Sequence, residues 1–230
     1  MPQLSIIIPF YNEEENVAPV LEEVLRCQPE AEVIAVDDGS RDTTADKIRG
    51  FPGVVLLSFP RNLGQSAAFY HGLHRAKGGI CVMMDGDGQN DPADIDALVA
   101  ALAHGDVACG YRRTRRDSFS KRLASRIANH IRKSVLGDGI RDTGCSLKAL
   151  RREHVKYLVP FNAMHRFIPA LLVNCGLKVV EVPVNHRHRT RGVSKYTVAG
   201  RAWRGLRDLL GVRWFMSRQI RWDLDPHRDD

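Results

Sequence analysis

The first half of the chain alternates short, uninterrupted apolar runs with stretches of helical periodicity. The apolar runs are Leu4–Pro9, Val33–Val36, Val54–Ser58, Ile80–Met84 and Val107–Cys109. Runs this short and continuous are typical of strands that are buried on both faces. Between them the pattern predicts helices at about 13–26, 42–49, 66–76 and 92–103. This alternation predicts an α/β fold in which a mostly parallel sheet lies in a helix–sheet–helix sandwich.

Two of these helices carry start signals. Asn12 is followed three residues later by Glu15, which is a cap-and-acid pattern for the first helix. Asp91 is followed directly by Pro92, a cap residue with proline at the first helical position. We therefore expect Asn12 and Asp91 to cap the first and last of the four helices.

The pattern changes after Tyr111. We expect a helix at about 118–136, a short element at Ser146–Leu150, a helix near 165–174 and a strand at Lys178–Val184. A polar loop, Asn185–Tyr196, then leads to a basic amphipathic helix at about 197–218. Neither repeats nor a low-complexity linker interrupt the chain. We predict a single domain over residues 1–230, with halves at about 1–111 and 112–196 and a C-terminal helix at about 197–222.

The net charge of +7 is unevenly distributed. Residues 1–109 carry 7 Lys and Arg against 17 Asp and Glu, whereas residues 110–230 carry 27 against 10. This asymmetry suggests two tasks, holding a cation and meeting an anionic partner, although basic residues that merely cover a soluble surface remain an alternative. No nucleic-acid recognition motif occurs, so we expect no nucleic-acid partner.

The remaining composition points to the cytoplasm. No apolar run approaches the length of a membrane span, and the N-terminus has no basic-then-apolar leader pattern. The five cysteines are far apart and odd in number, which favours reduced thiols over a disulfide framework.

Polar clusters follow three of the predicted strands, at Pro9–Glu13, Asp37–Ser40 and Asp85–Gln89. Ligands of an open parallel sheet bind beyond the carboxyl ends of its strands. Carboxylates that crowd there repel one another unless a cation neutralises them. Asp85, Asp87 and Gln89 offer oxygen ligands on alternating residues, which suits Mg²⁺ or Mn²⁺.

The loop after the first strand is acidic rather than glycine-rich. Asn12–Glu15 stands where a Rossmann or Walker phosphate loop would lie, and its charge opposes a bare pyrophosphate. This disfavours a dehydrogenase, a P-loop kinase and a sugar nucleotidyltransferase. We expect a diphosphate to be held through the metal instead, with residues after the first two strands taking the base and ribose.

Four ordered motifs resemble the family 2 glycosyltransferases with a GT-A fold. They are Ile6–Glu13, Val36–Thr44, Arg61–Gly64 and Asp85–Pro92. In the second half, Asp142–Cys145 and His186–Tyr196 are similar to the polyprenyl-phosphate branch, which includes dolichol-phosphate mannose synthase and bacterial undecaprenyl-phosphate sugar synthases. The family's acidic motif usually has larger residues where Gly86 and Gly88 stand, and we expect these glycines to loosen the backbone there.

The resemblance implies site residues of four kinds. Residues implied to contact the nucleotide-sugar are Pro9, Tyr11, Glu13, Val36, Asp38, Asp85 and Gly86. Those implied to hold Mg²⁺ or Mn²⁺ are Asp85, Asp87 and Gln89. Those implied to bind the acceptor phosphate are Arg112, Arg189, Ser194 and Lys195. The catalytic residues implied are Asp87, Arg189 and Lys195.

The resulting hypothesis is an inverting, metal-dependent transferase that moves sugar from a UDP- or GDP-sugar to a polyprenyl phosphate at the cytoplasmic membrane face. A phosphate acceptor is already anionic at pH 7 and needs little help from a general base. One alternative is a family 2 enzyme that glycosylates a hydroxyl of a glycolipid or polysaccharide. Another, from a different class, is a non-catalytic nucleotide-sugar binding module.

The C-terminal helix predicts how the chain reaches a lipid. An apolar stripe excludes Arg201 and Arg204 and comprises Trp203, Leu206, Leu209, Leu210 and Trp214. Such a helix can lie in an anionic membrane interface, directly or through a small membrane-protein partner. The alternative is that the stripe packs against the catalytic domain. His165 and Arg166 could reach the acceptor, although a structural role is the more ordinary interpretation.

Overall fold

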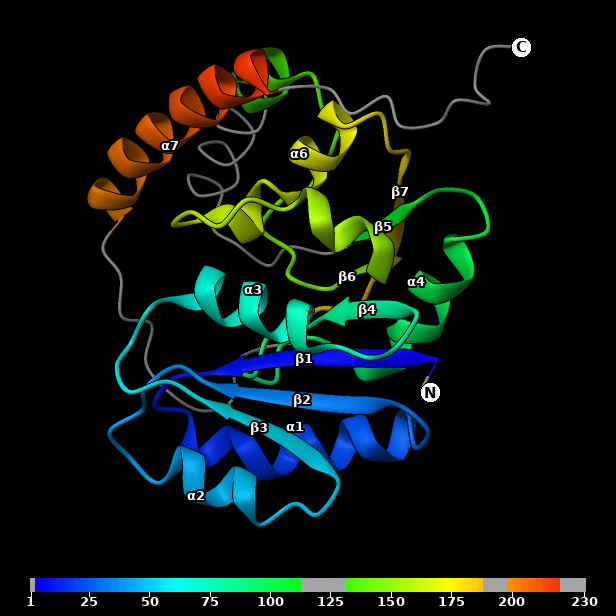
Figure 1. The fold of residues 1–230 in the computed structure, drawn as a ribbon, viewed down its shortest axis with the longest axis vertical. Coiled ribbons are helices and arrows are strands. Elements are labelled where there is room, and N and C mark those ends of the chain that lie inside the picture. Colours follow the sequence, from blue (N-terminus) through cyan, green and yellow to red (C-terminus); the bar gives the residue numbers. More distant parts are fainter. Residues whose placement is uncertain (1–2, 113–130, 188–197, 220–230) are drawn as a thin grey trace.

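A computed structural model describes residues 3–112, 131–187 and 198–219, with the backbone alone described for 198–204. One seven-stranded sheet in the order β3-β2-β1-β4-β6-β5-β7 forms its centre (Figure 1). The strands are β1 (Leu4–Phe10), β2 (Glu32–Asp37), β3 (Val54–Ser58), β4 (Ile80–Met83), β5 (Val107–Arg112), β6 (Lys148–Arg151) and β7 (Val179–Val184). Strands from both predicted halves therefore belong to the same sheet.

Of the seven strands, all except β6 run in the same direction. β1 pairs in parallel with β2 and β4, β2 with β3, and β5 with β7. β6 alone is antiparallel, between β4 and β5. Its first residue, Lys148, therefore lies at the edge where β4 and β5 end. The predicted mostly parallel sheet is confirmed.

Helices cover both faces of the sheet. In the described residues the α-helices include α1 (Glu14–Cys27), α2 (Thr44–Arg49), α3 (Gln65–Arg75), α4 (Ile95–Ala101), α6 (Ile168–Asn174) and α7 (Val198–Arg218). Short 3₁₀ helices are η1 (Pro92–Asp94), η2 (Arg152–Tyr157) and η3 (Met164–Arg166). Residues 131–136 are also helical.

The sheet separates two hydrophobic cores, because successive strand residues point to opposite faces. On β1, Ile6 and Ile8 pack with the buried residues of α1, α2 and α4. Ile7, between them, packs with those of α3, α6 and α7. The continuous apolar runs of the sequence thus have their expected cause, which is burial on both faces.

One of the two predicted helix caps is wrong. α1 begins at Glu14, and Asn12 does not cap it; the Asn12 Oδ1 atom instead accepts a hydrogen bond from Arg41 N at 2.8 Å. Asn12 has a φ of +50°, a conformation that asparagine tolerates better than most residues. The second cap is confirmed, since Asp91 Oδ1 accepts from Ala93 N at 3.1 Å and Pro92 opens η1.

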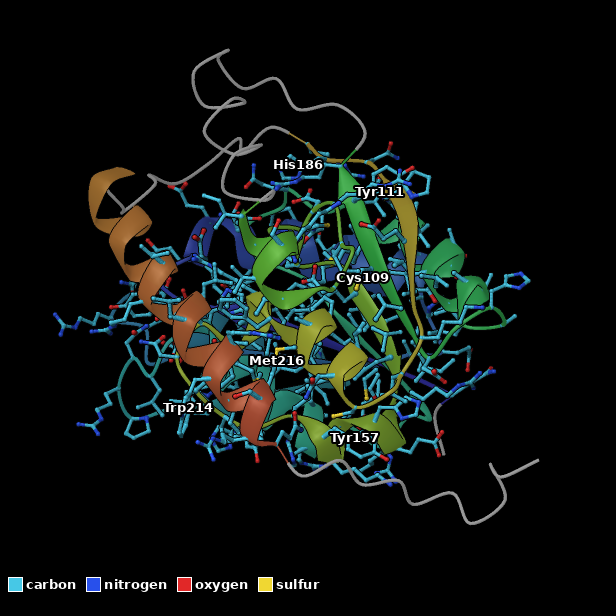
Figure 2. All side chains as sticks on the ribbon, turned by 90° about the horizontal axis from the view of Figure 1, so that it is seen from above. Cys109, Tyr111, Tyr157, His186, Trp214 and Met216 are labelled. Carbon is cyan, nitrogen blue, oxygen red and sulfur yellow. The ribbon has the colours of Figure 1, made fainter. Side chains whose placement is uncertain are left out.

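The predicted apolar stripe of α7 is divided between two faces. Leu209 is 6% exposed and packs with Val212 and Met216 in the core, so its assignment to the outward stripe is wrong. Leu206, Leu210 and Trp214 are exposed, which contradicts the alternative that they pack against the domain. Figure 2 shows Trp214 on the outer side of α7 and Met216 facing the body of the molecule. Within the described residues, none of the helices is both long and apolar enough to cross a membrane.

Candidate active site

The loops after β1 and β2 are joined by hydrogen bonds at the carboxyl edge of the sheet. Asn12 N donates to Ser40 Oγ at 2.9 Å, and Glu13 N donates to Thr44 Oγ1 at 3.0 Å. Small hydroxyl and amide side chains follow each strand because the backbone there needs partners outside the ladder. These contacts fix the predicted nucleotide-binding segments relative to each other.

Asp38, the residue after β2, holds the loop that follows β3 through hydrogen bonds. It is buried, and its carboxylate accepts from Leu63 N at 2.7 Å, Gly64 N at 2.9 Å and Asn62 Nδ2 at 2.8 Å. Burial raises the pKa of Asp38, and the backbone donors partly oppose that rise. The structure therefore shows why the Asp38 and Arg61–Gly64 motifs occur together.

The other predicted nucleotide contacts differ in accessibility. Pro9, Tyr11 and Glu13 are partly exposed at the end of β1. Val36 is 0% exposed and its side chain packs among the core residues beneath α3, so its predicted contact with the nucleotide stays a prediction that would have to involve the backbone. The reason is position: Val36 lies inside β2, one residue before the strand's end.

The turn after β4 brings two carboxylates together. Gln65, the first residue of α3, donates through Nε2 to Asp85 Oδ1 at 2.5 Å, and Gln89 N donates to Asp87 Oδ1 at 3.1 Å. Burial, reinforced by the charge of Asp87, raises the pKa of Asp85 to about 6. A buried carboxylate whose pKa is raised by burial and by a neighbouring carboxylate is the electrostatic condition that a divalent cation relieves.

Both glycines of this turn have structural reasons. A Cβ on Gly86 would lie 2.6 Å from the Phe10 ring and 2.7 Å from Pro9 O. Gly88 has a φ of +75°, which disfavours other residues. The expectation that Gly86 loosens the backbone is wrong, because its lack of a side chain lets the turn pack closely on β1.

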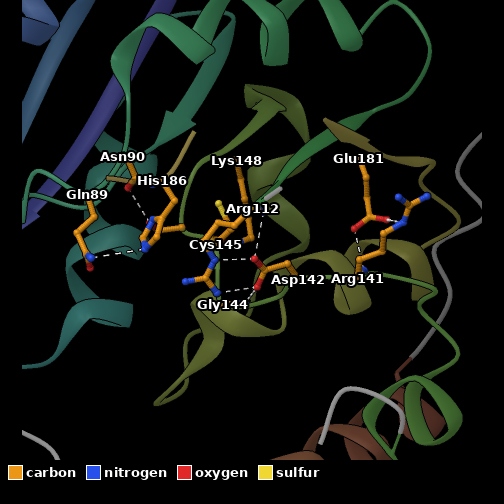
Figure 3. Close-up of polar contacts among 11 residues, drawn as sticks. Gln89, Asn90, Arg112, Arg141, Asp142, Gly144, Cys145, Lys148, Glu181 and His186 are labelled. Atoms are coloured by element: carbon orange, nitrogen blue, oxygen red, sulfur yellow. Dashed lines mark hydrogen bonds and ion pairs between the residues drawn. The ribbon is translucent and has the colours of Figure 1, made fainter. Parts of the chain in front are cut away.

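His186, the first residue of the His186–Tyr196 motif but without a predicted site role, lies beside this turn. His186 Nε2 is 3.5 Å from Gln89 Nε2, and Gln89 Nε2 also donates to Arg187 O at 3.3 Å (Figure 3). Arg187 is held in turn by Glu23 and Asp91, at 2.7 and 2.8 Å. The Gln89 side chain thus contacts the segment that follows β7, and His186 adds an imidazole to the site.

The end of β5 carries the predicted acceptor residue Arg112. Its Nε and Nη2 atoms donate to the two oxygens of Asp142 at 2.7 and 2.9 Å (Figure 3). Such a bidentate pair fixes the plane of the guanidinium. Nearby, Arg141 pairs with Glu181 at 3.3 Å. Arg112 therefore lies at the predicted edge, with its orientation set by the Asp142–Cys145 motif.

Buried polar groups lie behind the turn. Lys148 is 1% exposed and its Nζ donates to Cys145 O. His165 Nδ1 is 2.8 Å from Ser66 Oγ, and burial lowers the pKa of His165 to about 3. A lysine flanked by Leu147 and Ala149 in the predicted short element Ser146–Leu150 was the signal that could have identified Lys148.

The donor atoms of this edge fit a divalent cation. Asp85 and Asp87 supply hard carboxylate oxygens, and Gln89 and His186 are adjacent. Within the described part of the chain, no three His, Cys, Asp or Glu side chains converge on one point. A cation here would accordingly complete its coordination with amide oxygen or with oxygens of a bound phosphate.

Arg189, Ser194 and Lys195, which are predicted to bind the acceptor phosphate, lie outside the described residues. His186 and Tyr111 lie at one edge of the molecule in Figure 2. The segment that carries Arg189, Ser194 and Lys195 begins directly after Arg187.

A family model, glycosyl transferase family 2, matches residues 5–159. The chain belongs to this family. It is 38% identical, over 95% of its length, to dodecaprenyl-phosphate galacturonate synthase of Rhizobium johnstonii. It is 35% identical, over 84%, to undecaprenyl-phosphate 4-deoxy-4-formamido-L-arabinose transferase of Edwardsiella ictaluri. The chain spans 69% of the first relative and 62% of the second. The predicted family and its polyprenyl-phosphate branch are confirmed.

Solved structures show the same fold. Glucosyl-3-phosphoglycerate synthase from Mycobacterium tuberculosis with Mn²⁺ and UDP-glucose superposes with a TM-score of 0.67 at 21% identity, covering 92% of this chain and 79% of that one. The same synthase with Mg²⁺ and UDP gives 0.71 at 19% identity, covering 92% and 79%. The predicted GT-A fold is confirmed, and these neighbours were crystallised with a divalent metal and either UDP-glucose or UDP.

Proposed function

We propose that this family 2 glycosyltransferase transfers a sugar from a UDP- or GDP-sugar to a polyprenyl phosphate, with inversion at the anomeric carbon. The crowded Asp85 and Asp87 at the carboxyl edge carry the donor half of this proposal. The relatives named for dodecaprenyl and undecaprenyl phosphate support the acceptor half.

On the donor side, the segments after β1 and β2 would hold the base and ribose. Asp85, Asp87 and Gln89 would hold Mg²⁺ or Mn²⁺, which supplies Lewis-acid stabilisation of the departing diphosphate. Gln65 keeps Asp85 oriented by donating to Oδ1 at 2.5 Å. The acidic loop after β1 then need not contact phosphate.

On the acceptor side, one phosphate oxygen forms a bond to the anomeric carbon while the bond from that carbon to the nucleoside diphosphate breaks. The acceptor is already ionised, so no residue has to remove a proton. Arg112 stands at this edge, oriented by Asp142. Arg189, Ser194 and Lys195 would grip the same phosphate, because guanidinium and ammonium groups bind phosphate oxygens.

The lipid tail of such an acceptor lies in a bilayer, and α7 offers a surface to meet it. Leu206, Leu210 and Trp214 are exposed side by side, with exposed Arg207 and Arg213 beside them. Aromatic and aliphatic groups flanked by arginine favour an anionic interface. We place the protein at the inner face of the cytoplasmic membrane, bound peripherally through α7, directly or with a small membrane protein.

The test is a donor panel. Purified protein, undecaprenyl phosphate, Mn²⁺ or Mg²⁺ and radiolabelled UDP- and GDP-sugars are incubated, and label in the organic phase is counted. We expect one donor to label the lipid. Label transferred only to a glycolipid or polysaccharide hydroxyl would favour the alternative acceptor, and nucleotide-sugar binding without any transfer would favour a binding module.

A further inference from the structure

Asn90 ends the acidic turn and is 4% exposed. Its Oδ1 atom accepts two hydrogen bonds, from Asp85 N at 2.9 Å and from Ser146 Oγ at 2.9 Å. The first of these closes the turn that presents Asp85 and Asp87. The second reaches a residue more than fifty positions later in the chain, directly after the Asp142–Cys145 motif.

A third segment meets Asn90 through the backbone. Asn90 and His186 form an isolated antiparallel bridge, and Arg187 N donates to Gln89 O at 2.9 Å. The loop with Arg189, Ser194 and Lys195 follows immediately. Three stretches distant in sequence therefore meet at Asn90: the acidic turn and the segment before β6 through its side chain, and the segment after β7 through its backbone. Figure 3 shows Asn90 and His186 side by side.

The Ser146 side of this junction is itself fixed. Cys145 O accepts from the buried ammonium of Lys148, and Lys148 pairs in register with Met83 of β4 and Cys109 of β5. A buried polar network of this kind acts as a unit, so loss of one member displaces the others.

We propose that Asn90 and Ser146 are positioning residues whose shared hydrogen bond holds the Asp85 turn in its cation- and diphosphate-binding geometry against the acceptor side of the site. This rests on the proposed function, because it assumes that the turn binds a metal–nucleotide complex. Neither residue touches the reacting atoms in this account. Each acts through Asp85.

The experiment measures Mn²⁺ affinity by electron paramagnetic resonance of free Mn²⁺, in the presence of saturating UDP or GDP. The variants are Asn90→Ala, Ser146→Ala, their double mutant and Ser146→Thr, which keeps the hydroxyl. Ser5→Ala is the matched control: Ser5 is also buried, and its Oγ donates to Glu32 at 2.6 Å. It is the second residue of β1, at the end of the strands opposite the acidic turn. Thermal unfolding of each variant is recorded alongside.

One neutral hydrogen bond changes binding by about fivefold, and two by tenfold or more. We expect Ser146→Ala to weaken Mn²⁺ binding by about three- to fivefold and Asn90→Ala by about tenfold. The double mutant should be no weaker than Asn90→Ala, because linked residues are non-additive. Ser146→Thr should remain within about twofold of the wild type, and Ser5→Ala should bind Mn²⁺ normally despite a similar loss of stability.

The proposed coupling of Asn90 and Ser146 would be overturned if the losses of Mn²⁺ affinity multiplied in the double mutant. It would also be overturned if Asn90→Ala bound Mn²⁺ as tightly as the wild type. So would a Ser5→Ala variant weakened as much as Ser146→Ala, since this would indicate general loosening. A wild-type protein that binds Mn²⁺ and nucleotide but labels no lipid would contradict only the proposed acceptor. A wild-type protein that fails to bind Mn²⁺ in the presence of either UDP or GDP would overturn both proposals.

Discussion

At the scale of single residues, the site is a set of charges placed where the fold leaves them incompletely neutralised. Asp85 and Asp87 repel each other, and the Gln65 side chain and Gln89 backbone, which donate to them, are neutral rather than cationic. Arg112, by contrast, already has a carboxylate partner in Asp142. The carboxylate turn is thus the part of the site that gains most from binding a cation.

Asp87→Asn should abolish most activity while keeping the fold. An asparagine Oδ1 can still accept from Gln89 N, so the turn is retained, but one ligand charge is lost. We expect turnover to fall by about a hundredfold or more, as when a transition-state charge stabiliser is removed. Initial rates with and without EDTA provide the check. An active Asp87→Asn protein, or full activity in EDTA, would contradict the metal assignment.

Arg189→Ala and Lys195→Ala should each reduce lipid-dependent transfer far more than Arg115→Ala or Arg116→Ala. The reason is that a phosphate site depends on particular donors, whereas a diffuse basic surface depends only on total charge. Initial rates over a range of undecaprenyl phosphate concentrations separate the two cases. Equal losses in all four variants would show that the basic half acts only as a general electrostatic surface.

His165 predicts a pH dependence of stability. Its pKa is about 3 in the folded protein against 6.5 in an unfolded chain, so the unfolded state binds a proton more readily below pH 6.5. This contribution to stability is present above pH 6.5 and is lost progressively as pH falls towards 3. His165→Gln should remove this pH dependence. Between pH 7.5 and pH 5 the variant should therefore lose about 2 kcal/mol less free energy of unfolding than the wild type. Urea unfolding at pH 7.5 and pH 5 measures the difference; parallel losses in both proteins would contradict it.

At the scale of elements, α7 has two faces with different duties. Leu209, Val212 and Met216 pack into the core beside α6, while Leu206, Leu210 and Trp214 are exposed. Residues three and four apart share a helix face, so the division follows from the 3.6-residue period once one face is anchored. A stripe drawn from sequence alone cannot tell where the anchored face ends.

Adjacent leucines test this division. Leu209 is 6% exposed and Leu210 is 58% exposed, so Leu→Ala at the two positions removes the same atoms from different surroundings. Leu209→Ala should lower the free energy of unfolding by about 2–4 kcal/mol, and Leu210→Ala by less than about 0.5 kcal/mol. In flotation with anionic vesicles the order should reverse, with Leu210→Ala the weaker binder. Equal effects at both positions in either assay would contradict the two-face account.

At the scale of the whole molecule, charge separates along the sequence while the sheet joins both halves. The acidic half supplies β1 to β4, and the basic half supplies β6, β7, α6 and α7. β5 lies where the two meet and ends in Arg112. Because all these strands form one sheet, the edge with the proposed cation site and the basic surface proposed to meet lipid belong to one framework.

Membrane association should therefore be salt-sensitive. With the purified protein alone, we expect flotation with phosphatidylglycerol-containing vesicles at low ionic strength and its marked loss at 0.5 M NaCl, where exposed charges are screened. Neutral phosphatidylcholine vesicles should bind little. No flotation with anionic vesicles at low salt would exclude direct binding and leave a membrane-protein partner as the route.

The sequence alone determined the strands, the helices between them and the edge where the site lies, because burial on both faces and helical periodicity are local patterns. It also determined the family, through motifs at Ile6–Glu13 and Asp85–Pro92. Tertiary structure decided what depends on partners distant in sequence. Asn12 turned to Arg41 instead of capping α1, Val36 was buried, and Leu209 faced inward. The Asn90–Ser146 contact and the place of His186 beside Gln89 likewise follow from strand order, since β6 and β7 bring their flanking segments to a turn that local sequence cannot reach.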